Sequence, residues 1–126
     1  MNFPADLLYS PDHLWVRVAE GVAIVGPSDF AQEQMGRVQY VDLPGVGLHV
    51  AAGREMGFTV EAAKSMTDIV SPVTGTVVEV NRALADDPAP VNDDPYGAGW
   101  LARIELVAPL PADLMQAAAY RRMVGA

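Results

Sequence analysis

The sequence contains no cysteine in its 126 residues. A chain without thiols can form no disulfide and offers neither a thiolate metal ligand nor a thiol nucleophile, so any redox group would have to be added to it. It also lacks an apolar run long enough to span a membrane, and its N-terminus has neither the basic start nor the apolar centre of a signal peptide. We therefore expect a cytoplasmic protein with no membrane association.

Histidine is scarce as well. His13 and His49 are the only two, they are far apart, and neither belongs to an HExxH pattern, so we expect no histidine-rich zinc site. The phosphate-binding patterns GxGxxG and GxxxxGK are absent, and a net charge of -8 disfavours binding to nucleic acid phosphates. Nothing in the sequence assembles a nucleophile, a base and an oxyanion site, so we expect a protein without catalytic residues or a metal.

What the sequence does contain is a series of short apolar stretches between glycine- and proline-rich turns. Residues 13–26 predict two strands around the dipeptide Glu20-Gly21, and residues 55–81 predict three more. Residues 100–106 predict a last strand. This spacing indicates a mainly β fold, an antiparallel sandwich or small barrel, and the length fits one domain over residues 1–126.

Two helices are expected beside the strands. Ser28 or Asp29 can cap a short helix that ends at Gly36, which explains this Ser-Asp pair without a catalytic role. Residues 82–99, rich in proline and aspartate, predict a loop that sustains neither a strand nor a long helix. Pro111 can begin a C-terminal helix. The residues expected to cover one face of that helix are Leu114, Met115, Ala118 and Met123.

The chain has a single lysine, Lys64, whereas its other seven basic residues are arginine. A hairpin lysine often serves only solubility, but arginine would supply that charge equally well. Lysine differs in having a primary amine that can be acylated. Small neighbours place this amine at an exposed turn rather than in the apolar pocket that a Schiff-base lysine needs, and Glu61 and Asp68 flank it with acceptors for a basic partner. The position predicts modification by another enzyme.

At this point the chain resembles a known family, the H proteins of the glycine cleavage system, which are lipoyl carriers. In the most specific segment, Lys64 takes the place of the family's lipoylated lysine, after Val-Glu and before the Ser-Pro-x-x-Gly turn. The segments that carry the resemblance are YSPDHLWV, GPSDFAQEQMG, VQYVDLPGVG, VEAAKSMTDIVSPVTGTVVEVN, DDPYGAGWL and AYRRMV.

The resemblance implies a hybrid barrel-sandwich of antiparallel strands, with a short helix in the N-terminal half and a C-terminal helix. It implies lipoate joined to Lys64 by an amide, attached by a lipoate ligase or lipoyltransferase. The arm would shuttle the aminomethyl group of glycine between glycine decarboxylase, the folate-dependent aminomethyltransferase and the flavin enzyme dihydrolipoyl dehydrogenase. The carrier itself would catalyse nothing.

One departure from the family bears on the arm. Between His13 and Trp15 the family usually has an acidic residue, associated with the cleft that shelters the loaded arm, whereas this chain has Leu14. Leucine cannot accept a hydrogen bond from an ammonium group, and Asp12 is the candidate for supplying the carboxylate instead. The expected cofactor-binding residues are Lys64, Glu61, Asp68, His13 and Asp12.

Three alternatives stay open beside glycine cleavage. An H-like lipoyl carrier of another pathway, such as bacterial sulfur oxidation, would be expected to relax the cleft around position 14. A biotin carrier shares the barrel and the hairpin lysine, but Ala63 and Ser65 stand where that family has methionine. A purely structural module is the third, and it predicts that Lys64→Arg is harmless.

Overall fold

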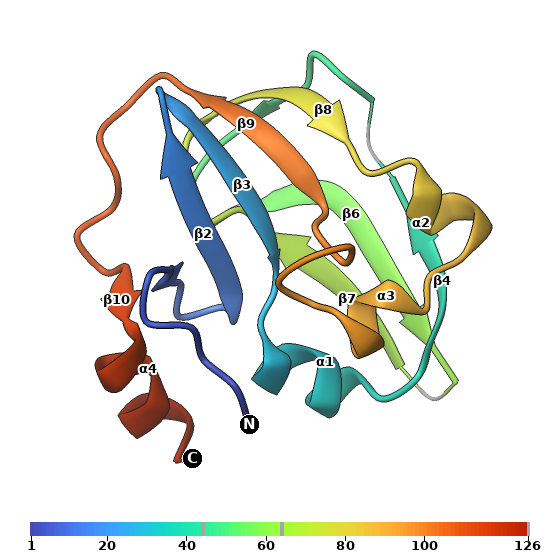
Figure 1. The fold of residues 1–126 in the computed structure, drawn as a ribbon. Helices are drawn as coiled ribbons and strands as arrows, with labels where there is room; N and C mark the ends of the chain where they lie inside the picture. Colours follow the sequence, from blue (N-terminus) through green and yellow to red (C-terminus); the bar gives the residue numbers. More distant parts are fainter. Residues whose placement is uncertain (44, 64, 126) are drawn as a thin grey trace.

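Two antiparallel sheets pack against each other in the computed structural model, which describes residues 1–43, 45–63 and 65–125 (Figure 1). The larger sheet has seven strands in the order β10-β1-β2-β3-β9-β8-β5, and the smaller has the order β4-β6-β7. The strands of the larger sheet are β1 (Leu8–Tyr9), β2 (Leu14–Ala19), β3 (Val22–Pro27), β5 (His49–Val50), β8 (Gly75–Val80), β9 (Ala102–Leu106) and β10 (Met115–Gln116). Those of the smaller sheet are β4 (Val38–Asp42), β6 (Glu55–Ala62) and β7 (Ser65–Val70).

The turn between β2 and β3 shows how the sequence determines the pairing. Glu20 and Gly21 both have positive φ, 53° and 77°, which a two-residue hairpin with the right-handed twist of its strands requires. Ala19 pairs with Val22 across this turn. The predicted hairpin is confirmed, as is the mainly antiparallel β fold, although the two sheets form a sandwich and do not close into a barrel.

Four short helices lie at the ends and connections of the strands: α1 (Asp29–Met35), α2 (Ala83–Asp86), α3 (Pro90–Asp93) and α4 (Ala117–Val124). The prediction for α1 is confirmed, because Ser28 Oγ accepts a hydrogen bond from the backbone N–H of Ala31 at 3.1 Å. Residues 82–99 contain no strand or long helix, as expected, but α2 and α3 each add one turn there. None of the helices in the described ranges is long and apolar enough to cross a membrane.

The prediction for the C-terminal helix is wrong in its start and in its buried face. The helix begins at Ala117, and Met115 belongs instead to β10, where it pairs with Tyr9. This pairing satisfies the backbone of Met115 in a sheet, so the helix cannot extend back to Pro111. Tyr120 is the buried residue of α4, whereas Ala118 and Met123 are exposed.

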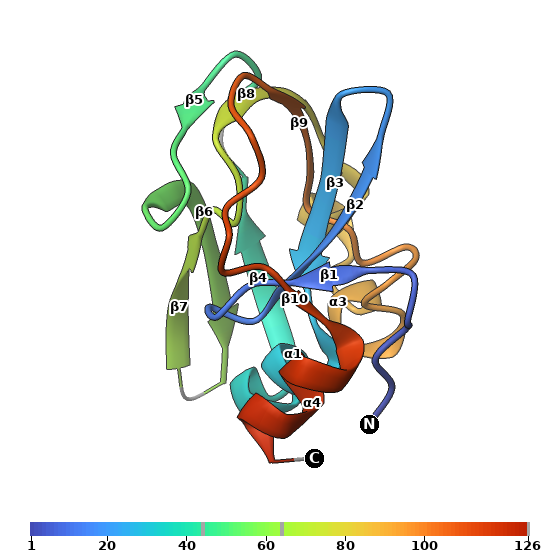
Figure 2. The same ribbon diagram turned by 90° about the vertical axis from the view of Figure 1, so that its left-hand side faces the viewer.

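Two hydrophobic clusters form the core. The main cluster lies between the sheets and includes Phe58 and Ile104. The second fastens α4 to β1 and β2, and its buried members are Phe3, Leu7, Tyr9, Trp15 and Tyr120. Burial of such side chains stabilises the fold by about 1.5–3 kcal/mol each. Figures 1 and 2 show that α1 and α4 lie at the same end of the sandwich as the connection between β6 and β7.

Candidate functional site

β6 ends at Ala62 and the antiparallel strand β7 begins at Ser65, so the short connection between them contains the single lysine of the sequence. Lys64 itself lies outside the described residues, but Ala62 pairs with Ser65, so the two strands are held together up to the positions next to the connection. β7 pairs with β6 along one side only and lies at the edge of its sheet. α1 and the segment before β2 lie beside β7, because residues of all three line the same cavities.

A groove lies along this edge of β7. It consists of two adjoining cavities of about 220 and 200 Å³, which share Asp12, His13, Ala31, Met35 and Thr67. One of them begins at Ser65, the residue after the lysine. The described residues that line it are Pro11, Asp12, His13, Leu14, Ala31, Gln34, Met35, Ser65, Thr67, Asp68, Ile69 and Val70. The lining combines apolar residues with hydroxyl-bearing and acidic ones, so the groove suits an occupant with an apolar chain and a polar end.

A tight turn before β2 presents Asp12 and His13 to the groove. The backbone N–H of His13 donates to the carbonyl of Ser10 at 3.0 Å, and that of Leu14 donates to Ser10 Oγ at 3.1 Å. His13 has a φ of 71°. Left-handed backbone is uncommon outside glycine, although histidine enters it more readily than most residues. The buried Ser10 side chain holds this conformation in place.

The side chain of His13 is half-buried and is held from the far side by the C-terminal helix. His13 Nδ1 lies 3.0 Å from the hydroxyl of Tyr120, which in turn lies 2.7 Å from Ser28 Oγ. The ring of Phe30 is 4.9 Å away. Burial lowers the pKa of His13 below its ordinary value, and the neighbouring Asp12 opposes that shift only in part. The uncharged imidazole is therefore favoured in the folded protein.

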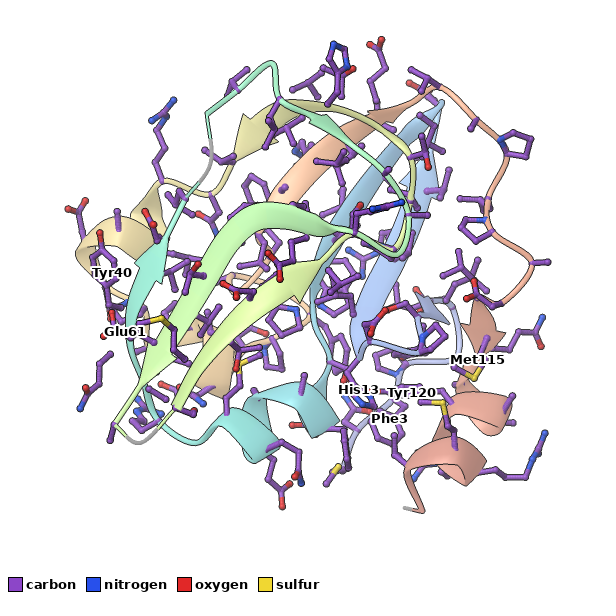
Figure 3. All side chains as sticks on the ribbon, turned by 180° about the vertical axis from the view of Figure 1, so that it is seen from behind. Phe3, His13, Tyr40, Glu61, Met115 and Tyr120 are labelled. Atoms are coloured by element: carbon purple, nitrogen blue, oxygen red, sulfur yellow. The ribbon has the colours of Figure 1, made fainter. Side chains whose placement is uncertain are left out.

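Of the five predicted site residues, three line the groove and one, Glu61, lies elsewhere, while Lys64 lies outside the described residues. Asp12 and His13 line the groove together with residues of β7. Glu61 instead projects from the outer face of the small sheet, where its cross-strand neighbours are Tyr40 and Met66, exposed by 52 and 65%. Figure 3 shows Tyr40 and Glu61 together on one side, well away from His13 and Tyr120.

Asp68 takes part both in the groove and in a contact across the small sheet. It contributes to the groove lining, and its Oδ1 accepts a hydrogen bond from Thr59 Oγ1, its cross-strand partner, at 3.1 Å. Leu14, by contrast, has a side chain only 1% exposed that belongs to the main core cluster. The groove thus has an apolar floor at position 14, and the acidic residues of its lining are Asp12 and Asp68.

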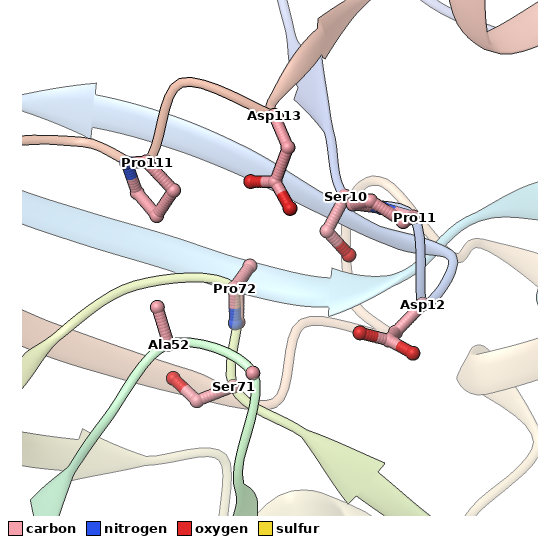
Figure 4. A pocket seen from close by; sticks show the side chains of 9 residues that line it. Ser10, Pro11, Asp12, Ala52, Ser71, Pro72, Pro111 and Asp113 are labelled. Atoms are coloured by element: carbon pink, nitrogen blue, oxygen red, sulfur yellow. The ribbon is translucent and has the colours of Figure 1, made fainter.

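A separate cavity of about 210 Å³ lies on the other side of Asp12 (Figure 4). Its walls include Pro11, Pro72 and Pro111, and the hydroxyl of buried Ser71 is already used by the carbonyl of Val73 at 2.6 Å. None of the residues next to the lysine belongs to this cavity. The groove along β7 is therefore the candidate functional site.

Sequence reasoning missed Tyr120, Met35 and Thr67 as parts of the site. Ser28 and Gly36 were recognised only as the ends of a helix, whose inward face proves to be one wall of the groove. Tyr120 is 107 residues from His13, and no local pattern signals a contact over that separation. Among the described residues no group of three or more histidine, aspartate or glutamate side chains is arranged to hold a metal ion.

Three comparisons with known proteins give the same family, and each match covers nearly the whole chain. Residues 7–126 match the sequence model of a family described as glycine cleavage H-protein. A glycine cleavage system H protein of Marinobacter nauticus is 49% identical over 99% of this chain and 97% of its own length. The one from Myxococcus xanthus is 46% identical over 98% and 95%. The crystal structure of a glycine cleavage system H protein from Mycobacterium marinum superposes with a TM-score of 0.91 at 37% identity, covering 98% of this chain and 100% of that one.

Proposed function

Because this chain belongs to the glycine cleavage H-protein family, whose members are lipoyl carriers, we propose that Lys64 bears lipoate through an amide bond and that the arm shuttles the aminomethyl group of glycine. The chain itself would be a non-catalytic carrier in the cytoplasm. Its partners would be glycine decarboxylase, aminomethyltransferase and dihydrolipoyl dehydrogenase, with a lipoate ligase or lipoyltransferase to attach the cofactor. We infer further that residues 1–126 make up one carrier domain.

The observation that carries this proposal is that the groove begins at Ser65, directly after the lysine. An extended lipoyl-lysine reaches roughly 15 Å from its Cα atom to the ring sulfur, at ordinary bond lengths. β7 runs from Ser65 to Val70 beside the groove, and six strand residues cover about 17 Å, at the usual rise per residue. The arm and the groove are therefore matched in length.

The residues of the groove fit the chemistry of the group. Leu14 and Ile69 are buried and offer an apolar floor for a hydrocarbon arm. Asp12 is exposed at the rim, where its carboxylate can pair with an ammonium group on the cargo. When bound, lipoate supplies a dithiolane that can be reduced, loaded and reoxidised, which is chemistry that a cysteine-free chain cannot provide.

The arm must also leave the groove to enter a partner's active site. Holding its base between two paired strands limits the volume that the arm explores, which raises its effective concentration at a docked enzyme. The chain's net charge of -8 favours partners with basic docking surfaces and makes the encounter depend on salt.

Leu14 supports a second candidate, an H-like lipoyl carrier of another pathway such as bacterial sulfur oxidation. Its side chain is buried in the core and brings no acceptor to the groove. In this alternative the lysine is still lipoylated, but the groove need not hold an aminomethyl cargo. The two candidates differ only in what the arm carries.

The mass of the peptide containing Lys64, from protein purified from its own host, tests the carrier function. We expect a lipoyl-sized increment, and an unmodified lysine in cells that lipoylate other proteins would contradict the proposal. Incubating the fully lipoylated carrier with glycine and glycine decarboxylase then separates the pathways. Aminomethylated product supports glycine cleavage, and its absence favours the alternative.

A further inference from the structure

We propose that Tyr120 and Ser28 position His13 as an uncharged N–H donor facing the groove. The proposal concerns how the groove receives its occupant and rests on the function proposed above. It assigns a role at the site to the C-terminal helix, since Tyr120 is the buried residue of α4. Figure 3 shows Tyr120, His13 and Phe3 gathered in one place.

A line of four hydrogen-bonding groups connects α1 with the groove. The backbone N–H of Ala31 donates to Ser28 Oγ at 3.1 Å. Ser28 Oγ lies 2.7 Å from the hydroxyl oxygen of Tyr120, and that oxygen lies 3.0 Å from His13 Nδ1. The distances alone do not say which way the hydrogens point along the line.

Burial of Ser28 decides the direction. Its side chain is completely inaccessible to solvent, and among the described residues Ala31 and Tyr120 are its only partners. If Tyr120 donated to Ser28, the serine hydrogen would have neither an acceptor nor water, which is a costly arrangement for a buried polar group. If Ser28 donates to Tyr120 and Tyr120 donates to His13 Nδ1, every hydrogen in the line has an acceptor.

This direction fixes the tautomer of His13. Nδ1 accepts a hydrogen bond, so a neutral imidazole must carry its hydrogen on Nε2. Within the described ranges Nε2 has no partner, and no buried side-chain nitrogen or oxygen there lacks one, so Nε2 is open to solvent. Because His13 lines both cavities of the groove, its free N–H is available to an acceptor on the arm.

The same line opposes protonation of His13. A cation would carry hydrogens on both nitrogens, which would reverse the line and leave the Ser28 hydrogen unpaired. One carboxylate beside the imidazole favours the cation, that of Asp12 in the same turn, and the other acidic residue of the groove lining is Asp68 on β7. The residues that face it from α1 do not titrate: Phe30, Ala31, Gln34 and Met35.

A neutral His13 determines the charge of the groove. Among the described residues, the lining then contains two acidic residues, Asp12 and Asp68, and no positive charge. A protonated amine on the cargo is attracted to these acidic residues, whereas an imidazolium beside it would repel it. Holding His13 uncharged therefore preserves the selectivity of the groove for a cationic cargo despite the leucine at position 14.

The test is the ¹⁵N NMR spectrum of the His13 imidazole in the full, unmodified chain. We expect the Nε2–H tautomer in the natural protein. Tyr120→Phe should remove the bias toward that tautomer and raise the titration midpoint toward the ordinary value of about 6.5. A natural protein in the Nδ1–H form, or a folded Tyr120→Phe protein with an unaltered His13 spectrum, would overturn the proposal.

Two more variants make the result specific. Ser28→Ala removes the group that fixes the direction, so it should weaken the tautomer bias even though Tyr120 remains. Tyr96→Phe is the matched control, because the Tyr96 hydroxyl donates to the carbonyl of Asn2 at 2.6 Å and accepts from Asp29 N–H at 2.9 Å, outside the line. It should leave the His13 spectrum unchanged. An equal effect from the control would contradict a specific role for Tyr120.

The lipoylated chain then tests whether His13 Nε2–H interacts with the arm. In the lipoylated, aminomethyl-loaded chain we expect the Nε2 resonance of His13 to shift relative to the unmodified chain, and to shift less in Tyr120→Phe. An unshifted resonance in a loaded carrier would contradict the proposal. A chain that is never lipoylated would contradict the proposed function alone, since the tautomer is measured without the cofactor.

Discussion

The phenol rings of Tyr9 and Tyr120 stack face to face, with centroids 4.7 Å apart and planes inclined by only 7°. Tyr9 lies in the first strand and Tyr120 in the last helix, and neither is exposed to solvent. Phe3 adds an edge-to-face contact with Tyr120 at 5.2 Å. This stack joins the two ends of the chain and places the Tyr120 hydroxyl next to the groove.

Removing the Tyr120 ring should destabilise the whole protein. Tyr120→Ala deletes a fully buried aromatic side chain and leaves a cavity between α4 and β1, so the free energy of unfolding should fall by about 3–5 kcal/mol. Urea denaturation of the two proteins measures the difference. Tyr40→Ala is the control, because Tyr40 is 52% exposed and its loss should have little effect.

Gly26 is predicted to tolerate no side chain. It pairs with Trp15 across β2 and β3, and a Cβ atom there would lie 2.8 Å from the indole Nε1. That nitrogen donates to the carbonyl of Pro95 at 2.8 Å, so the fully buried ring cannot move away freely. Gly26→Ala should cost about 1–3 kcal/mol by overpacking.

Thermal unfolding of Gly26→Ala and Gly45→Ala provides the comparison. A Cβ atom at Gly45 would meet nothing within 4 Å, so this second substitution should leave the melting temperature nearly unchanged. Equal losses from both would mean that the close approach to Trp15 does not limit position 26.

Acid should destabilise the protein through His13. Its pKa is lowered in the folded state by burial, so the unfolded chain binds the proton more readily. The contribution of His13 to stability is therefore complete above the unfolded value of about 6.5 and is lost as the pH falls through the lower folded value. Denaturation midpoints measured from pH 8 down to 5 should decline over this interval.

His13→Asn separates this effect from other acid-sensitive groups. Asparagine accepts positive φ and does not titrate in this range, so the decline should become shallower in the variant. His49→Asn, at the exposed histidine, is the control for the loss of a histidine as such. A decline that is identical in all three proteins would point to groups other than His13.

Lys64→Arg should abolish lipoylation and carrier activity, because a guanidinium cannot form the amide. The change preserves the positive charge and nearly the length of the side chain, so the free energy of unfolding should stay within about 0.5 kcal/mol of the natural value. Mass spectrometry and an assay with glycine and the three partner enzymes measure the two effects. Activity retained by the arginine variant would show that the lysine is not the point of attachment.

Local signals were enough for much of the fold. Glu20-Gly21 predicted the β2–β3 hairpin because left-handed backbone at two successive positions has few other uses. Ser28 and Gly36 predicted α1 because the capping groups lie next to the helix that they end. Family resemblance added the sandwich arrangement, which a list of strands alone left undecided.

The missing parts depend on contacts between distant segments. Pro111 is a valid helix start in isolation, but Met115 pairs with Tyr9 in a sheet and delays the helix to Ala117. His13 was expected at the site, whereas the residues that hold it come from α1 and α4. Tertiary contacts of this kind override local propensity and leave no trace in a single segment.

The Glu20-Gly21 turn has a practical use. It lies at the opposite end of the sandwich from the connection between β6 and β7 (Figures 1 and 2). The side chain of Glu20 is exposed, and it could be replaced by a cysteine that would be unique in the chain. A thiol there would let the carrier be tethered to a sensor chip by the end opposite the β6–β7 connection, or labelled with a fluorophore at a distance from that connection.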